Sequence, residues 1–308
     1  MTNCVRCGRP ISDSSYAATS NLCPECRQAF AATRPPTINQ SPLTPKSPGP
    51  YRPPITVALV GANILVFLVM VLRGVPLMNP SPAQLLPFGA DFGPFTLGGQ
   101  PWRILASNYV HIGLVHIFFN MWCLWNLGRL AERILGGWTY FLVYTACGIA
   151  GSLASLWVHP TAVGAGASGA IFGLAGALIT ALYLGKLPYP GQMLRGLMRS
   201  LLSFAGYNLF FGAVVPGIDN SAHIGGLVMG LVIGALLARQ LNEVPEKRRA
   251  HEFLMFTLAA LFLIGFGAFV RKQSGWVVES IASSIPAHRK RESLDKLAPG
   301  SPKNNVDK

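Results

Sequence analysis

The sequence is poor in charged residues, and acidic residues are the scarcest of them. Asp, Glu, Lys and Arg together make up 12% of its 308 residues, and only 12 residues are Asp or Glu. Soluble globular proteins carry roughly 25% charged residues, whereas 51% of this chain is hydrophobic. This scarcity of charge excludes an ordinary soluble enzyme and indicates a membrane protein.

Long stretches without any charged side chain predict the spans. The longest lies between Arg133 and Lys186, and it can hold two spans of roughly 20 residues each, with a turn near His159–Pro160. With the other stretches the total is seven spans, which predicts an all-α polytopic membrane protein. No apolar run precedes Ile55, so no cleavable signal peptide is expected and the first span would direct insertion itself.

The net charge of +13 would suggest nucleic-acid binding in a soluble protein, but nucleic acid is not expected here because the basic residues follow the positive-inside rule. The outer loops hold only Arg73 and Arg103. The sequence therefore predicts a multi-pass protein of a plasma or bacterial-type inner membrane with a cytoplasmic N-terminus. One feature conflicts with this topology, since seven spans place the basic tail after Val270 outside. The basic residues expected on the inside are Arg129, Arg133, Lys186, Arg195, Arg199, Arg239, Lys247, Arg248 and Arg249.

Composition divides the chain into five segments. Residues 1–30 form a head with four cysteines, and residues 31–54 are rich in proline, which predicts an extended spacer. The main membrane domain covers residues 55–241. Residues 242–270 are expected to form a cytoplasmic loop and the seventh span, and residues 271–308 a polar, basic tail.

The head contains two Cys-x-x-Cys pairs, Cys4 with Cys7 and Cys23 with Cys26. Four thiolates in this spacing predict a structural zinc site, and Gly8 suits the turn that follows such a pair. Two disulfides or a redox role are the alternatives, but a cytoplasmic head is kept reduced, which favours zinc. The head resembles a zinc ribbon, and a docking module for a protein partner is its expected role, with regulation of the membrane domain second.

Ser168 and His223 are polar residues inside predicted spans, where such residues are costly and mark function by default. Ser168 lies in the run Gly166–Gly169, and glycines follow His223 at four-residue spacing. Two small-residue stripes allow close helix contact, so facing stripes would bring His223 to Ser168. A serine alone would more often be a packing residue, but the pair predicts a nucleophile and its base.

His116 and Asn120 lie four residues apart in the second span and project from one helix face. They could be hydrogen-bonding partners between helices, but an imidazole and an amide aimed at one point are suitable donors for an oxyanion. Asp219, one turn before His223, could complete a triad. A solvated loop residue is the favoured reading of Asp219, which leaves a Ser/His dyad.

These residues in this order resemble the rhomboid family of intramembrane serine proteases. The resemblance covers about residues 55–241 and includes Trp102–Arg103 in the loop before the second span. It implies a six-helix bundle, to which this chain adds a seventh helix. Ser168 would be the nucleophile and His223 the general base, with His116, Asn120 and the Ser168 backbone N–H as the oxyanion hole. Catalysis would need no cofactor.

The predicted function is cleavage of single-span membrane proteins within the lipid bilayer, near its outer face. A catalytically silent rhomboid-like binder or chaperone of membrane helices is the alternative. A transporter is disfavoured because the sequence shows no internal repeat. One departure is Phe172, where some rhomboids have a tyrosine that stacks under the base, so stacking without a hydroxyl is expected here.

Overall fold

The computed structural model describes residues 3–11, 22–32, 53–185, 190–240 and 245–284. It divides the chain into two compact units, residues 1–52 and 53–308. Most of the predicted proline-rich spacer and the end of the predicted basic tail lie outside the described residues.

The described part of the first unit is small. Helix α2 (Pro24–Ala32) follows the second cysteine pair, and one isolated bridge joins Asn3 to Pro10. Cys4, Ile11 and Cys23 are buried together, and Arg9 forms an ion pair with Glu25 at 2.6 Å. So few buried side chains cannot supply much folding free energy, which is the situation in which a metal site matters most.

The second unit is a bundle of long helices, and its described residues contain no strand beyond one isolated bridge. Five of the helices are long and apolar enough to span a membrane, and α7 makes a sixth together with the short helices before it, from which it is bent by 92°. The protein is therefore an integral, multi-pass membrane protein, and the predicted all-α fold is confirmed. The long helices are α3 (Pro54–Leu72), α7 (Gly113–Leu135), α8 (Gly137–Val158), α9 (Ser168–Leu184), α10 (Gly191–Val214), α11 (Asn220–Ala238) and α12 (Pro245–Ser284).

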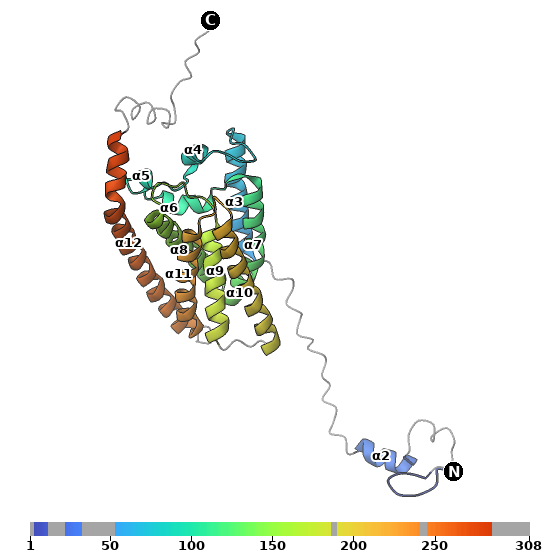
Figure 1. Ribbon diagram of the computed structural model, residues 1–308. Helices are drawn as coiled ribbons and strands as arrows, with labels where there is room; N and C mark the ends of the chain where they lie inside the picture. Colours follow the sequence, from blue (N-terminus) through green and yellow to red (C-terminus); the bar gives the residue numbers. More distant parts are fainter. Residues whose placement is uncertain (1–2, 12–21, 33–52, 186–189, 241–244, 285–308) are drawn as a thin grey trace. The chain divides into compact units, whose positions relative to one another are not determined.

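Helix α9 lies in the middle of the bundle, among α7, α8, α10 and α11 (Figure 1). It has only 17 residues, fewer than a span normally needs. Its residues from Gly169 to Leu178 are all buried, so it is enclosed by protein rather than by lipid. A helix in that position need not cross the whole hydrocarbon layer, because its ends can meet polar groups inside the bundle.

The glycine stripes of α9 and α11 face one another as their spacing predicts. A Cβ atom on Gly226 would collide with the carbonyl oxygen of Gly169, and one on Gly230 would collide with that of Gly173. The two backbones therefore touch directly, with no side chain between them. This close approach sets the distance between the first turns of the two helices, where the polar residues lie.

The loop between α3 and α7 is folded into short helices at one end of the bundle (Figure 1). Arg103 organises it from the inside, since its guanidinium donates to the carbonyls of Leu86 (2.7 Å) and Ala90 (2.9 Å) and lies 4.8 Å from the Trp102 ring centre. Trp102 itself is exposed. The short helices are α4 (Pro82–Leu85), η1 (Leu86–Phe88), α5 (Gly93–Thr96), α6 (Arg103–Ala106) and η2 (Ser107–Tyr109).

Helix α12 packs along α8 and reaches the loop helix α5. At one end Glu252 accepts a hydrogen bond from Thr139 of α8 (3.0 Å), and Arg248 donates to the carbonyl of Leu135 (2.5 Å). At the other end Val270 is fully buried beside Leu97. Helix α12 continues to Ser284, beyond residue 270, where the predicted tail begins.

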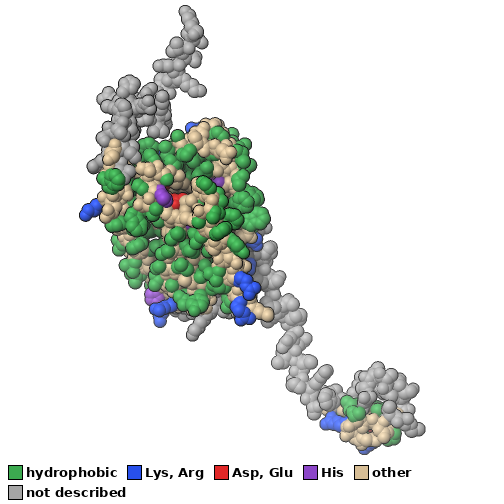
Figure 2. All heavy atoms as spheres, in the orientation of Figure 1, with side chains coloured by type: hydrophobic (Ala, Val, Ile, Leu, Met, Phe, Trp, Pro, Cys, Tyr) green, Lys and Arg blue, Asp and Glu red, His purple; other side chains and the backbone are tan. Residues whose placement is uncertain are grey.

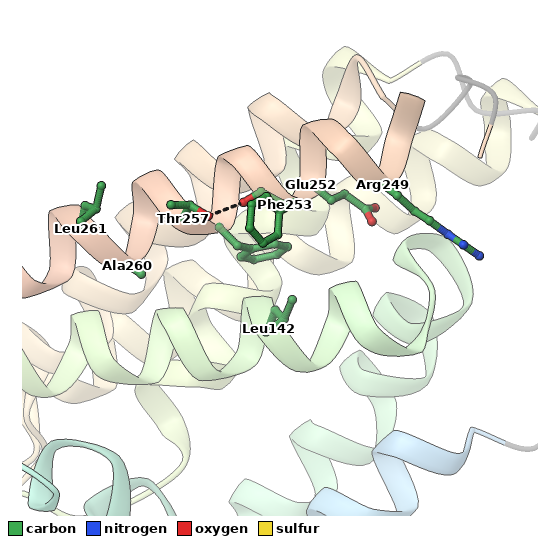
Figure 3. Close-up of a pocket in the computed structure, with 8 residues that line it drawn as sticks. Leu142, Arg249, Glu252, Phe253, Thr257, Ala260 and Leu261 are labelled. Atoms are coloured by element: carbon green, nitrogen blue, oxygen red, sulfur yellow. Dashed lines mark hydrogen bonds between the residues drawn. The ribbon is translucent and has the colours of Figure 1, made fainter. Parts of the chain in front are cut away.

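Hydrophobic side chains dominate the visible side of the bundle, and Lys and Arg side chains appear toward its ends (Figure 2). A groove of about 530 Å³ lies between α8 and α12, with Leu142 facing Phe253 across it (Figure 3). Its lining includes none of the predicted site residues.

Candidate active site

Ser168 is the first residue of α9, and the backbone before it is extended and rich in small residues. Gly166 has φ +131°, a conformation that side chains strongly disfavour, and a Cβ atom there would lie 2.7 Å from the His116 ring. This glycine is therefore required both for the turn and for the approach of the imidazole. The N-terminus of α9 leaves backbone N–H groups and a positive dipole end beside the Ser168 hydroxyl.

His223 lies in the first turn of α11 and points at Ser168. Its Nε2 is 2.9 Å from Ser168 Oγ, and the histidine is only 8% exposed. The ring stacks on Phe172, one turn after Ser168, with the ring centres 4.3 Å apart and the planes inclined by 15°. The structure thus brings the predicted serine and histidine into hydrogen-bond contact and holds the imidazole flat against a ring that has no hydroxyl.

Two loop contacts hold the extended segment that leads to Ser168. Asp91 and Gly164 exchange backbone hydrogen bonds of 2.8 Å in both directions, and the Gly166 N–H donates to the carbonyl of Ser107 at 2.9 Å. Burial raises the pKa of the Asp91 carboxyl to about 7, although a hydrogen bond from Thr96 and the charge of Arg103 act against that rise. The folded loop between α3 and α7 therefore holds the backbone segment that leads into Ser168.

His116 and Asn120 lie on α7, and the structure brings the His116 ring against Gly166. The Nδ1 atom of His116 accepts from the Ile112 N–H at 3.2 Å, which leaves the Nε2 atom to carry the proton. Asn120 is 6% exposed, and its amide donates to the His116 carbonyl at 2.9 Å. That amide has a second N–H group. Each of the two side chains therefore has an N–H group that can act as a donor.

Two further polar residues, His111 and Asn108, were not singled out from the sequence. His111 is fully buried with its Nε2 atom 3.5 Å from the Ala167 N–H, and Asn108 is 4% exposed. Asn108 lies in η2, just before the 92° bend that precedes α7, and His111 lies within the bend. Two histidines five residues apart were a signal in the sequence that could have drawn attention to His111. Hydropathy, however, does not predict the bend at which His111 lies.

Asp219 is neither a third member of a triad nor a simply solvated loop residue. It is the N-cap of α11, and its Oδ1 accepts from the backbone N–H groups of Ser221 (3.0 Å) and Ala222 (3.3 Å) and from the Ser221 hydroxyl. The group that meets the Nδ1 atom of His223 is the Oδ1 atom of Asn220, at 3.2 Å. The sequence reasoning did not single out Asn220.

The four cysteine sulfur atoms of the head lie within 4.8 Å of one another, and those of Cys7 and Cys23 are 3.6 Å apart. A tetrahedral zinc ion with Zn–S bonds of about 2.3 Å needs sulfur atoms about 3.8 Å apart, so the set fits that ion. Backbone hydrogen bonds, first that of Cys23, lower the pKa of the Cys4 thiol to about 6, whereas side-chain hydrogen bonds, first that with Cys23, raise the pKa of the Cys26 thiol to about 12, so the pKa shifts by themselves do not favour a set of four thiolates. Gly8 has φ +73° in the turn after Cys7.

Comparisons with known proteins show which family the chain belongs to. A family model described as "Rhomboid domain" matches residues 98–240. Rhomboid protease GluP of Bacillus subtilis is 36% identical over 212 residues, which are 69% of this chain and 40% of the relative. RHOMBOID-like protein 4 of Arabidopsis thaliana is 31% identical over 201 residues and is half covered. This chain therefore spans half or less of the length of these two relatives.

Rhomboid protease AarA of Providencia stuartii is 31% identical over 232 residues. The match covers 68% of this chain and 80% of the relative's own length. Because this match extends over most of a named rhomboid protease, and the family model covers the helices that carry Ser168 and His223, the chain belongs to the rhomboid family.

Proposed function

We propose that the protein is an intramembrane serine endopeptidase that cuts the transmembrane segments of single-span membrane proteins. Ser168 is the nucleophile and His223 the general base. The observation that carries this proposal is the 2.9 Å separation of His223 Nε2 and Ser168 Oγ at the N-terminus of a buried helix. A hydroxyl is a weak nucleophile by itself, and a base at hydrogen-bond distance activates it.

The first half of the reaction forms an acyl-enzyme. The Ser168 hydroxyl adds to the scissile carbonyl while its proton moves to the Nε2 atom of His223. The resulting oxyanion receives hydrogen bonds from the Ser168 backbone N–H, His116 and Asn120, and these donors act strongly because the site is shielded from bulk water. His223 then returns the proton to the leaving amine as the C–N bond breaks.

Water completes the cycle by adding to the acyl carbonyl, again with His223 as base, and releases the new carboxyl end and free Ser168. A peptide bond inside a helix already has its hydrogen bonds satisfied, so the substrate must unwind locally before it can be cut. Helix-breaking residues near the cleavage site make that unwinding cheaper. The distribution of basic residues supports a cytoplasmic N-terminus, which puts Ser168 near the outer face of the membrane.

The test is cleavage of a single-span substrate in proteoliposomes, with active-site labelling by a fluorophosphonate. Ser168→Ala and His223→Ala should each lower the cleavage rate by about 10³-fold or more, and the label should attach to Ser168. Ser200→Ala is the matched control, since Ser200 is exposed on α10 and bonds only its own helix at 3.1 Å. A chain that binds the substrate without cutting it, and takes up no label, would instead be a silent rhomboid-like binder.

We also propose that the cysteine head holds one structural zinc ion, supported by the fit of the four sulfur atoms to a tetrahedral site. The ion would supply folding free energy to a unit with little core and would take no part in cleavage. Metal analysis of the full-length protein should find one zinc per chain, lost in Cys23→Ser and retained in the control Cys123→Ser. Two disulfides without metal would refute the site.

A further inference from the structure

Asn220 joins the imidazole of His223 to a different helix. Its Oδ1 atom lies 3.2 Å from His223 Nδ1, and its Nδ2 atom donates to the carbonyl of Leu209 on α10 at 2.9 Å. A carbonyl oxygen can only accept, so the bond to Leu209 fixes which end of the amide faces α10 and leaves Oδ1 facing the histidine. The N-cap Asp219 holds the first turn of α11 in which both residues lie.

We infer that Asn220 is the positioning residue for His223. It determines which ring nitrogen of His223 carries the proton, and it connects that choice to α10. An amide oxygen has no proton to give, so the Nδ1 atom of His223 must carry the hydrogen in this contact. The Nε2 atom is then the bare nitrogen, aimed at Ser168 Oγ at 2.9 Å. This is the tautomer that a general base needs, and it is selected by a neutral group where many serine hydrolases use a carboxylate.

Helix α10 is in close contact with the Asn220 amide, but few of its other residues are packed against the bundle. A Cβ atom on Gly212 of α10 would overlap the Asn220 amide, so the two helices meet there in direct contact. Leu201 and Ala205 are the only buried residues of α10, and of the five long apolar helices it is the least buried, at 11%. A shift of α10 therefore meets little resistance from packing and changes the Leu209 contact that orients the amide.

This inference rests on the proposed function, but the tautomer can be measured without any cleavage. Nitrogen NMR of the protein labelled at histidine should show His223 protonated at Nδ1, and Asn220→Ala should give a mixture of both tautomers. Asn208→Ala is the control, because the exposed Asn208 amide bonds only its own helix at 2.8 Å. An unchanged Nδ1–H tautomer in Asn220→Ala would refute the positioning role.

In the cleavage assay Asn220→Ala should lower kcat by roughly 10- to 10²-fold with KM little changed, because the base rather than binding is affected. Asn220→Asp keeps an acceptor and should recover most of kcat. Its negative charge stabilises the imidazolium, so the acid limb of the pH profile should move to higher pH. Asp219 and His116 also interact with the His223 charge and stay unchanged in both variants. Equal kcat losses in Asn220→Ala and Asn220→Asp, with no movement of the acid limb, would contradict the inference.

The link to α10 has its own pair of variants. Gly212→Ala should displace the Asn220 amide and lower kcat, although it changes neither α11 nor Ser168. Gly206→Ala on the same helix places its Cβ in open space and should behave as wild type. If Gly212→Ala and Gly206→Ala have the same kcat and the same His223 tautomer, α10 does not act through Asn220. If the wild-type protein takes up no label at Ser168 although His223 is protonated at Nδ1, that result would instead count against the proposed protease function.

Discussion

Replacing Glu132 by alanine should destabilise the membrane bundle by about 3–5 kcal/mol. Glu132 lies near the end of α7, is 2% exposed, and accepts three hydrogen bonds at the start of α3. The donors are the Ile55 N–H (3.0 Å), the Thr56 N–H (2.8 Å) and the Thr56 hydroxyl (2.7 Å). The residue before α3, Pro53, makes no side-chain cap, so this carboxylate from another helix caps α3.

The magnitude follows from what the truncation leaves behind. Each buried donor without a partner costs about 1–3 kcal/mol, so three such donors would cost about 3–9 kcal/mol. Water that reaches the helix end brings the total toward the lower part of this range. Glu132→Gln keeps an acceptor oxygen but loses the charge that suits a helix N-terminus, so about 1–2 kcal/mol is expected. Thr56→Val removes the hydroxyl donor, so no donor is left without a partner, and the change should cost about 1 kcal/mol.

Unfolding in mixed micelles, followed by tryptophan fluorescence as the denaturing detergent is increased, measures these differences. Glu246→Gln is the control, because Glu246 is exposed at the start of α12. The cleavage rate of the folded Glu132 variants should stay close to that of the wild type. A free energy of unfolding for Glu132→Ala within 1 kcal/mol of the wild type would refute the capping argument.

Two further predictions test the packing and the loop. Gly226→Ala should lower the free energy of unfolding by about 2–3 kcal/mol and slow cleavage, because it separates α11 from the carbonyl of Gly169, while Gly61→Ala on α3, where the Cβ meets open space, should do neither. Burial raises the pKa of Asp91 from 3.8 to about 7, so the unfolded chain releases this proton earlier than the folded protein as pH rises. Stability should therefore fall by at most about 4 kcal/mol between pH 4 and pH 7, and unfolding measured at several pH values should show no such fall in Asp91→Asn.

The sequence predicted the features that depend on short segments. Scarce charge and long apolar stretches indicate the membrane class. Seven spans were predicted, and the described residues have five helices long and apolar enough to span, or six with the bent pair, because α9 is shorter than a span. The four-residue spacing after His223 predicted the helix contact that the structure has at Gly226. The side chains of Ser168 and His223 are correctly paired for the same reason, since each lies at the start of a glycine stripe. The boundary between the seventh span and the basic tail at residue 270 stays a prediction, although α12 itself continues to Ser284.

The sequence by itself therefore determined that the protein lies in a membrane, that it is built of helices, and which polar residues are candidates for catalysis. These follow from local properties, namely the free energy of placing each side chain in lipid and the periodicity of small residues. Only the tertiary structure decided that His111 lies against Ala167 and that Asn220 meets Leu209 of α10. The N-cap bonds of Asp219 are local, whereas each of these two contacts joins segments that are distant in the sequence. Such contacts arise from the packing of whole helices, and no local pattern in the chain encodes them.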